Sequence, residues 1–388
     1  MLDLPKKLQQ KLSDRTDNGK LRNLSKGENL IDLSSNDYLG FAHNATIYAQ
    51  TFQYLLIKNL SQNGASGSRL ISGNHQLYAD LEQYLIEFHQ VESALVFNSG
   101  YDANIGFFSS VPQRNDLVFY DELIHASIRD GIAMGNAKGY KFKHNSLVDL
   151  KEKIKLSVRA QSRTMDVNIY IVTESVFSMD GDSPDLKQLC EFCTEYGYYL
   201  VVDEAHAIGV FGTKGEGLLQ ELNLEEQVFA RIITFGKAMG VHGAALLGSP
   251  SLKAYLLNFA RSFIYTTGLP PHTIATVFSA YKFLESSPGI EQQKNLKSNI
   301  EFFNSKCISL SLESFFIPST SAIQSCIISG NDKVKAISKK LADAGFGVKA
   351  ILSPTVKEGE ERLRFCLHSF NSKEDIGFAL QMLKKYLK

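Results

Sequence analysis

Short apolar runs that recur along the middle of the chain constrain its fold more than any other feature. They begin near residues 94, 117, 168, 199, 230 and 244, and most are separated by stretches with helical spacing. Runs of this length that are apolar on both faces are typical of strands in a parallel sheet covered by helices. The pattern therefore predicts an α/β fold, with a mostly parallel sheet and helices on both of its faces.

The pattern changes after Tyr281, where a charged helical stretch leads into short segments that alternate between apolar and polar residues. The alternating segments and the helical stretch between them are Ala322 to Ile328, 333–344 and Leu363 to Leu367. Alternation of this kind indicates strands, so we expect a smaller α+β domain at the C-terminus.

Length and composition allow two or three domains. The chain has 388 residues, of which 44% are hydrophobic and 21% charged, as in ordinary globular proteins. We expect an N-terminal helix and arm, a large α/β domain that binds the cofactor, and the small domain, over residues 1–44, 45–285 and 286–388.

Charge and cysteine content narrow the functional classes. Lys plus Arg and Asp plus Glu both number 41, and a zero net charge argues against a nucleic-acid or membrane partner. The start of the chain lacks the apolar core of a signal peptide. Five scattered cysteines do not form a disulfide framework, and Cys190 and Cys193 lack a second pair to complete a zinc site. We therefore expect a cytoplasmic protein without a metal.

One lysine lies in a glycine-rich stretch between two apolar runs. Lys237 is in Thr234–Gly243, after Ile232-Ile233 and before Ala244–Leu247. Burial lowers the pKa of an amine, and a lowered pKa is what Schiff-base chemistry needs. The alternative is an ordinary surface lysine whose stem packs against the turn.

A second stretch favours the chemical interpretation. Tyr199–Val202 is predicted to be a buried strand, and Asp203 follows at its carboxyl end, where ligands bind in open α/β sheets. A lysine and a carboxylate so placed are the pair that pyridoxal phosphate requires. The lysine attaches the cofactor, and the carboxylate keeps the pyridine nitrogen protonated. His206, three residues after Asp203, would reach the phenolic oxygen of the ring.

Together these motifs resemble the α-oxoamine synthases, pyridoxal-phosphate enzymes of fold type I. The resemblance covers nearly the whole chain, from Ser34-Ser35-Asn36-Asp37-Tyr38-Leu39-Gly40 to Arg362-Leu363-Arg364. It implies that an amino acid is condensed with an acyl thioester and loses its carboxylate. It also implies a homodimer with active sites built from both chains, in which the loop Gly64–Gly73 contributes at the interface.

Within the family the chain most resembles the members that join L-alanine to pimeloyl-CoA, or to pimeloyl carrier protein, in biotin biosynthesis. Ser321–Gln324 and Ile351–Val356 carry that likeness. Glycine C-acetyltransferase, aminolevulinate synthase and serine palmitoyltransferase are the alternatives, because they share the lysine, the aspartate and the histidines.

The resemblance assigns roles to individual residues. Gly100 and Tyr101 open a helix whose N-terminus would hold the cofactor's phosphate, and His125 would stack on the pyridine ring. The implied cofactor contacts are Gly100, Tyr101, His125, Ser178, Asp203, His206, Thr234 and Lys237.

The remaining assignments concern catalysis and the substrate. Arg364 would bind the amino-acid carboxylate through a bidentate pair, with Asn36 as its helper. Arg22 and Thr355 complete the substrate contacts. The implied catalytic residues are Lys237, His125, Asp203 and His206.

Two other classes fit the sequence less well. Asp203-Glu204-Ala205-His206 spells the DEAH box of helicases, but Lys237 is followed by Ala238, and no phosphate-binding G-x-x-x-x-G-K-[ST] loop is present. An inert partner subunit could keep the fold without the chemistry. The presence of Lys237, Asp203, His206 and His125 argues against that interpretation.

Overall fold

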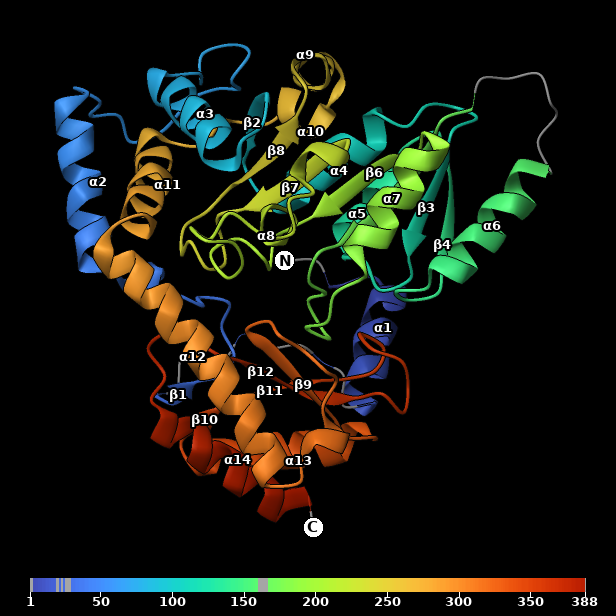
Figure 1. The fold of residues 1–388 in the computed structure, drawn as a ribbon, viewed down its shortest axis with the longest axis vertical. Helices are drawn as coiled ribbons and strands as arrows, with labels where there is room; N and C mark the ends of the chain where they lie inside the picture. The colour runs from blue at the N-terminus through green and yellow to red at the C-terminus, as the bar shows by residue number, and fades with distance from the viewer. Residues whose placement is uncertain (1–2, 19–20, 22–23, 25–28, 160–166, 388) are drawn as a thin grey trace. The chain divides into compact units, whose positions relative to one another are not determined.

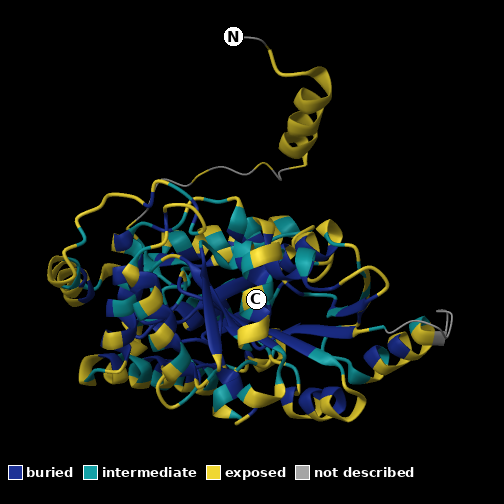
Figure 2. Ribbon diagram, turned by 90° about the horizontal axis from the view of Figure 1, so that it is seen from above, coloured by how far each residue is buried: buried dark blue, intermediate teal, exposed yellow. Residues whose placement is uncertain are grey.

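The computed structural model describes residues 3–18, 21, 24, 29–159 and 167–387. The chain divides into two compact units, residues 1–30 and 31–388. In the first unit, the predicted N-terminal helix is α1 (Lys6–Asp17), which has no buried residue (Figure 2). The second unit contains the sheets and the candidate site. None of the helices in the described ranges is both long and apolar enough to cross a membrane.

A seven-stranded sheet forms the centre of the second unit (Figure 1). Its strands, in spatial order, are β2 (Ser93–Phe97), β8 (Ala244–Gly248), β7 (Ala230–Thr234), β6 (Tyr199–Asp203), β5 (Ile169–Glu174), β3 (Leu117–Asp121) and β4 (Lys138–Phe142). β8 runs antiparallel to β2 and β7, and the other neighbours are parallel. The mostly parallel sheet predicted from the apolar runs is confirmed.

The edge strand β4 was not predicted. Its sequence, Lys138-Gly139-Tyr140-Lys141-Phe142, is mostly polar, and only Phe142 is buried. An edge strand pairs with one neighbour and is half covered, so it needs no continuous apolar run. The central strands are covered on both faces, and their apolar sequences made them recognisable.

Helices cover both faces of this sheet. Along each central strand, consecutive residues belong to different cores: Val202 joins one apolar cluster and Val201 the other. The helices are α2 (Ala45–Ile57), α3 (Gln76–His89), α4 (Gly100–Ser110), α5 (Ala126–Met134), α6 (Leu147–Arg159), α7 (Leu186–Tyr196), α8 (Leu218–Glu221), α9 (Pro250–Phe259), α10 (Arg261–Ile264) and α11 (Pro271–Leu284). Residues of α4, α5, α9 and α10 form one core with the sheet, and those of α3, α6, α7 and α11 join the other. Cys190 and Cys193 are buried on α7.

The C-terminal part has the α+β character that was predicted, and its small sheet is antiparallel. Its order is β11 (Lys349–Ile351), β12 (Arg362–Cys366) and β9 (Ile323–Ile327). The helices that accompany it are α12 (Ser287–Ser309), α13 (Asn331–Asp343) and α14 (Lys373–Leu387). A separate parallel pair joins β1 (Ile31–Asp32) to β10 (Phe346–Gly347). The end of the arm expected over 1–44 therefore pairs with the C-terminal segment.

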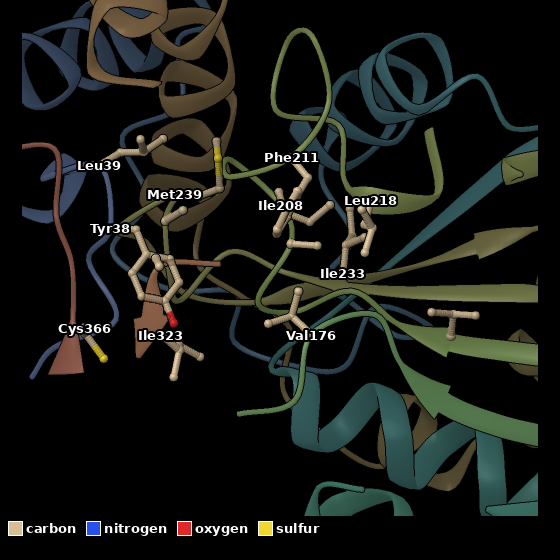
Figure 3. Close-up of a cluster of buried hydrophobic side chains, with 14 of the residues drawn as sticks. Tyr38, Leu39, Val176, Ile208, Phe211, Leu218, Ile233, Met239, Ile323 and Cys366 are labelled. Carbon is tan, nitrogen blue, oxygen red and sulfur yellow. The ribbon is translucent and has the colours of Figure 1, made fainter. Parts of the chain in front are cut away.

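One apolar cluster connects the large sheet to the small one (Figure 3). It contains Tyr38 from the segment after β1, Val176 from the loop after β5, and Ile323 and Cys366 from the small sheet. Because these side chains pack into a common core, the small sheet is held at the carboxyl ends of the large sheet's parallel strands. That contact places Arg364 beside the candidate site.

Candidate active site

A cavity of about 250 Å³ lies at the carboxyl ends of the parallel strands. Most of the predicted site residues line it: Asn36, Gly100, Tyr101, His125, Asp203, His206, Thr234 and Lys237. Ser178 and Thr355 line a neighbouring cavity instead, and Arg364 contacts Asn36 at the wall of the first. Arg22 lies outside the described residues.

Lys237 follows β7 in a tight turn. The Gly240 N–H donates to the Lys237 carbonyl oxygen over 2.8 Å, which closes the turn. Gly240 has φ +64°, and a Cβ there would lie 2.2 Å from the backbone nitrogen of Ala42, so only glycine fits. Burial lowers the pKa of the Lys237 amine, whereas the charges of Asp203 and Glu174 act in the opposite direction.

Asp203 ends β6 and is only 6% exposed. Its Oδ1 accepts the Ala205 N–H over 2.9 Å, and its Oδ2 accepts the Asn104 amide Nδ2 over 2.9 Å. Both oxygens therefore accept hydrogen bonds, an arrangement suited to an ionised carboxylate, which has no hydrogen to donate.

His206 is buried beside the cavity and is paired with a tyrosine. Its Nδ1 lies 2.7 Å from the Tyr38 hydroxyl, which is also 3.3 Å from the Asn36 Oδ1. Burial lowers the pKa of His206 well below its usual value, and the charges of Lys237 and Arg364 add to the effect. Burial raises the pKa of Tyr38. His206 is therefore a neutral imidazole, and Tyr38 keeps its proton.

His125 is the N-cap of α5 and lines the cavity. Its Nδ1 accepts the Ser127 N–H over 3.2 Å and lies 2.7 Å from the Ser127 hydroxyl. Its backbone N–H donates to the Glu174 carboxylate. Partial burial lowers the pKa of His125, so its Nδ1 can act as the acceptor of a neutral ring.

Sequence reasoning assigned no site role to several residues that line this cavity, among them Glu174 and Asn104. Glu174 ends β5 and is paired in register with Asp203, and burial together with the charge of Asp203 raises its pKa to about 8. Asn104 lies one helical turn after Gly100 on α4. The sequence did carry signals for both: an acidic residue at the end of a neighbouring strand, and the four-residue helical spacing from the expected phosphate site.

The N-terminus of α4 fits a phosphate group. Ser99 caps the helix by accepting the Asp102 N–H over 3.1 Å, and Gly100 begins the first turn. A Cβ on Gly100 would lie 2.6 Å from the Thr234 Cγ2, so glycine keeps this approach open. Thr234 Oγ1 is buried and has no hydrogen-bond partner among the described residues. Backbone donors at a helix start beside an unpartnered hydroxyl are a suitable cradle for the phosphate of pyridoxal phosphate.

Arg364 is held in a fixed orientation at the edge of the cavity. Its Nε donates to the Ser178 carbonyl over 2.6 Å, and one terminal nitrogen donates to the Asn36 Oδ1 over 3.0 Å. Arg362, two residues earlier on β12, instead forms a buried ion pair with Asp180. The two arginines share a face of the strand but have different partners.

The neighbouring cavity is larger, about 730 Å³, and shares His125 with the first. Ser178 and Thr355 lie on its wall. It extends from the start of α5 to the loop between β11 and β12. Its lining contains both cations and carboxylates: Arg129, Lys141, Lys357 and Arg362, and Glu122, Asp180, Glu358 and Glu360. Lys357 lies 3.5 Å from the Glu122 carboxylate.

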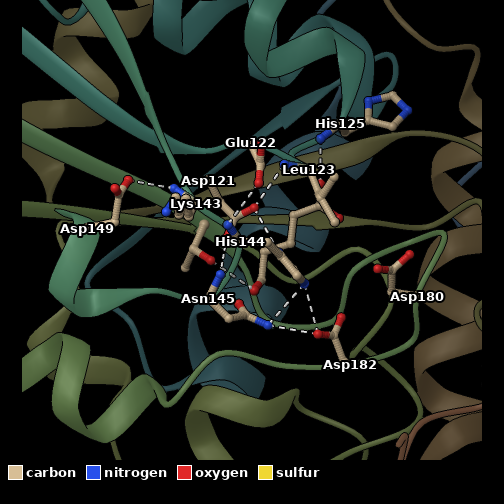
Figure 4. A network of polar contacts seen from close by, with 12 residues as sticks. Asp121, Glu122, Leu123, His125, Lys143, His144, Asn145, Asp149, Asp180 and Asp182 are labelled. Carbon is tan, nitrogen blue, oxygen red and sulfur yellow. Dashed lines mark hydrogen bonds and ion pairs between the residues drawn. The ribbon is translucent and has the colours of Figure 1, made fainter. Parts of the chain in front are cut away.

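A polar network holds the loop after β3 beside the loop after β5 (Figure 4). His144 lies between two carboxylates, with Nδ1 2.9 Å from Asp121 and Nε2 2.9 Å from Asp182. Partial burial lowers the pKa of His144, but the hydrogen bonds to these carboxylates and their charges outweigh it and raise the pKa to about 10. The histidine is therefore an imidazolium that joins the segment containing His125 to the segment containing Ser178.

Comparisons with known proteins agree with this geometry. The sequence matches the family described as aminotransferase class I and II over residues 28–382. It is 38% identical over 367 residues to the 8-amino-7-oxononanoate synthase of Emericella nidulans, covering 92% of this chain and 89% of that protein.

Two solved structures are similar along almost their whole length. A serine palmitoyltransferase variant from S. paucimobilis, with pyridoxal phosphate and myriocin bound, has a TM-score of 0.86 at 26% identity, covering 98% of this chain and 96% of that one. The 8-amino-7-oxononanoate synthase of Francisella tularensis has a TM-score of 0.76 at 29% identity, covering 92% and 98%.

The fold and the site thus define a pyridoxal-phosphate enzyme of fold type I. The chain belongs to the class I and II aminotransferase family, in its α-oxoamine synthase branch. Its cofactor is pyridoxal 5′-phosphate, and its activity is that of an acyltransferase acting on an amino acid and an acyl thioester.

Proposed function

We propose that this enzyme condenses L-alanine with pimeloyl-CoA, or with pimeloyl carrier protein, in biotin biosynthesis. In this reaction the alanine α-carbon bonds to the pimeloyl carbonyl carbon, the C–S bond breaks and the thiol leaves. The alanine carboxylate departs as CO₂, and the product is 8-amino-7-oxononanoate. Similarity to proteins named for this product, from Emericella nidulans and Francisella tularensis, supports the proposal.

The observation that carries the proposal is the pair of cavities that meet at His125. The smaller one contains Lys237 and Asp203 and suits a small amino acid. The larger one, about 730 Å³, has room for a long acyl thioester, which an acetyl group would not need. Arg129, Lys141 and Lys357 on its wall are cations suited to the terminal carboxylate of a pimeloyl chain.

In this proposal the cofactor, when bound, supplies an electron sink. Lys237 carries the cofactor and then takes the alanine α-proton on Nζ, a task that suits an amine with a lowered pKa. Asp203 holds the proton on the pyridine nitrogen. His206, kept neutral and oriented by Tyr38, donates toward the phenolic oxygen, and Ser178 is assigned to the same oxygen.

The remaining roles concern the phosphate, the ring and the substrates. Gly100, Tyr101 and Thr234 are assigned to the phosphate, and His125 to the face of the pyridine ring. Arg364, oriented by Asn36, is assigned to the alanine carboxylate. Thr355 and Arg22 are assigned to the acyl substrate, and Thr355 lies on the wall of the larger cavity.

We also infer a cytoplasmic homodimer whose active sites are shared between chains. The exposed apolar side chains of α2, Tyr48, Phe52, Leu56 and Ile57, support the dimer, because a protein surface seldom leaves so many together uncovered. Light scattering of the purified protein tests it, and a monomer at micromolar concentration would contradict it. The predicted boundary between the large and the small domain, between residues 285 and 286, also stays a prediction.

A substrate comparison tests the function. We expect turnover of alanine with pimeloyl-CoA to exceed that of glycine with acetyl-CoA and of serine with palmitoyl-CoA by at least tenfold. A preference for either of the other pairs would reject the proposed substrates while leaving the α-oxoamine synthase class intact. Lys357→Ala is a useful companion variant, because removing a cation from the larger cavity should raise the KM for pimeloyl-CoA and leave alanine binding unchanged.

A further inference from the structure

We propose that Asn104 is a positioning residue whose single amide group orients both Asp203 and His125. The inference rests on the proposed roles of those two residues at the cofactor's ring. Asn104 is 2% exposed on α4, and its Nδ2 has two acceptors: the Asp203 Oδ2 over 2.9 Å and the Ser127 Oγ over 3.0 Å. An amide nitrogen has two hydrogens, so both are used.

The direction of these hydrogen bonds follows from Asp203. An ionised carboxylate can only accept, so the nitrogen end of the Asn104 side chain must face it. Asn104 Oδ1 has no partner within the part of the chain that the structure describes. Leaving a buried polar atom without a hydrogen bond costs free energy. The two hydrogen bonds of the Asn104 nitrogen must therefore be what keeps the amide in this orientation.

The hydrogen bond from Asn104 to Ser127 determines which nitrogen of the neutral His125 ring carries the proton. Ser127 Oγ accepts from Asn104, which leaves its own hydrogen to donate to the His125 Nδ1 over 2.7 Å. The Ser127 backbone N–H points at the same nitrogen. Two donors therefore face the His125 Nδ1, so the proton of the neutral ring lies on Nε2.

The position of Asn104 on α4 explains how one side chain can contact both Asp203 and the segment that contains His125. It lies one turn after Gly100, so α4 presents its N-terminus to the phosphate and Asn104 to the ring. Helix α5, which begins beside His125, approaches closely through Gly131, where a Cβ would lie 2.9 Å from the Asn104 carbonyl oxygen. This close packing fixes the backbone of Asn104 relative to His125.

Loss of the amide has a defined consequence at each end. A hydrogen-bond donor stabilises a carboxylate in its charged form, so removing one makes Asp203 bind a proton more strongly. The proton shared with the pyridine nitrogen should then move toward Asp203. At the other end, Ser127 loses its donor and its hydroxyl is free to rotate, so His125 loses part of its preference for one tautomer.

The test compares Asn104→Ala and the isosteric Asn104→Leu with the matched control Ser127→Ala. The first readout is the ¹⁵N shift of the pyridine nitrogen, measured on the holoenzyme loaded with ¹⁵N-labelled cofactor. We expect both Asn104 variants to move this signal toward its neutral value, and Ser127→Ala to leave it at the parental position. The second readout is the ¹⁵N signal of His125 in the apoprotein, which should move in all three variants.

Cofactor affinity is the third readout, and we expect Asn104→Ala to weaken it about tenfold. An unmoved pyridine signal in the Asn104 variants, an equal movement in Ser127→Ala, or an unmoved His125 signal in the Asn104 variants would each overturn the proposal. Failure of both Asn104 variants to fold would also overturn it, because the residue would then be structural. None of these measurements uses an acyl substrate, so their outcome is independent of whether pimeloyl-CoA is the true donor.

Discussion

Replacement of Arg364 by alanine gives the sharpest test of how this site holds its amino acid. Arg364 is 6% exposed, and its guanidinium is fixed by the Ser178 carbonyl and the Asn36 side chain. Its orientation is therefore set before the substrate arrives, and little side-chain entropy is lost on binding. Arg364→Ala removes the charge and both fixed bonds but leaves Lys237 and the cofactor cradle in place.

The size of the effect follows from the kind of bond. A hydrogen bond to a charged group contributes roughly 1.5–3 kcal/mol. At about 1.4 kcal/mol for each factor of ten, the dissociation constant of alanine should rise between about tenfold and somewhat over a hundredfold. The dissociation constant of alanine in Arg364→Lys should lie between those of Arg364→Ala and the parent, because lysine keeps the charge but lacks the planar guanidinium.

Arg362→Ala is the matched control on the same strand face. Arg362 forms a buried ion pair with Asp180, so its removal leaves that carboxylate unpaired. Loss of one partner of a buried pair typically destabilises by about 3–5 kcal/mol. We therefore expect Arg362→Ala to lower the free energy of unfolding, and to change alanine binding less than about threefold.

The assay is a titration of alanine against the absorbance of the bound cofactor, with unfolding in urea measured on the same preparations. The reasoning predicts a crossed result, with Arg364→Ala losing affinity and Arg362→Ala losing stability. An alanine dissociation constant in Arg364→Ala equal to that of the parent would refute the carboxylate role. A larger loss of affinity in Arg362→Ala would mean that the other arginine binds the substrate.

Three further outcomes are expected. Borohydride should fix the cofactor to Lys237, and Lys237→Ala should fold without turning over; a label on another lysine in peptide mapping would contradict this. Asp203→Asn should lose α-proton exchange from alanine, followed by NMR in deuterated water, far more than it loses alanine binding; equal exchange rates would make the carboxylate structural. The raised pKa of His144, about 10, contributes stability that is fully present below pH 6.5 and is lost as the pH rises through 10. In His144→Gln the free energy of unfolding should therefore lose about 2–4 kcal/mol less than in the parent as the pH rises through 10. If the free energy of unfolding, measured in urea, changes with pH equally in variant and parent, the contacts of His144 with Asp121 and Asp182 contribute nothing to stability.

The sequence by itself predicted the central strands of the large sheet and a position for the chemistry. Strands covered on both faces are mostly apolar, so the runs before Asp203 and Thr234 were visible without any partner being known. Polar residues directly after such strands lie at one edge of the sheet. Lys237 and Asp203 could therefore be paired before the structure was available, although their roles stay predictions until they are tested.

Only the tertiary structure showed which distant residues each side chain contacts, because the periodicity of one segment carries no information about other segments. Strand alternation placed Arg362 and Arg364 on one face but could not distinguish them. Their partners do: Asp180 holds one, and Asn36, 328 positions away in the chain, holds the other. The same limit applies to Asn104, whose two acceptors lie 23 and 99 positions away. Local sequence indicates which segments are buried, because burial of a segment sets its apolar pattern, whereas the hydrogen-bond partner of a side chain is set by how distant segments pack.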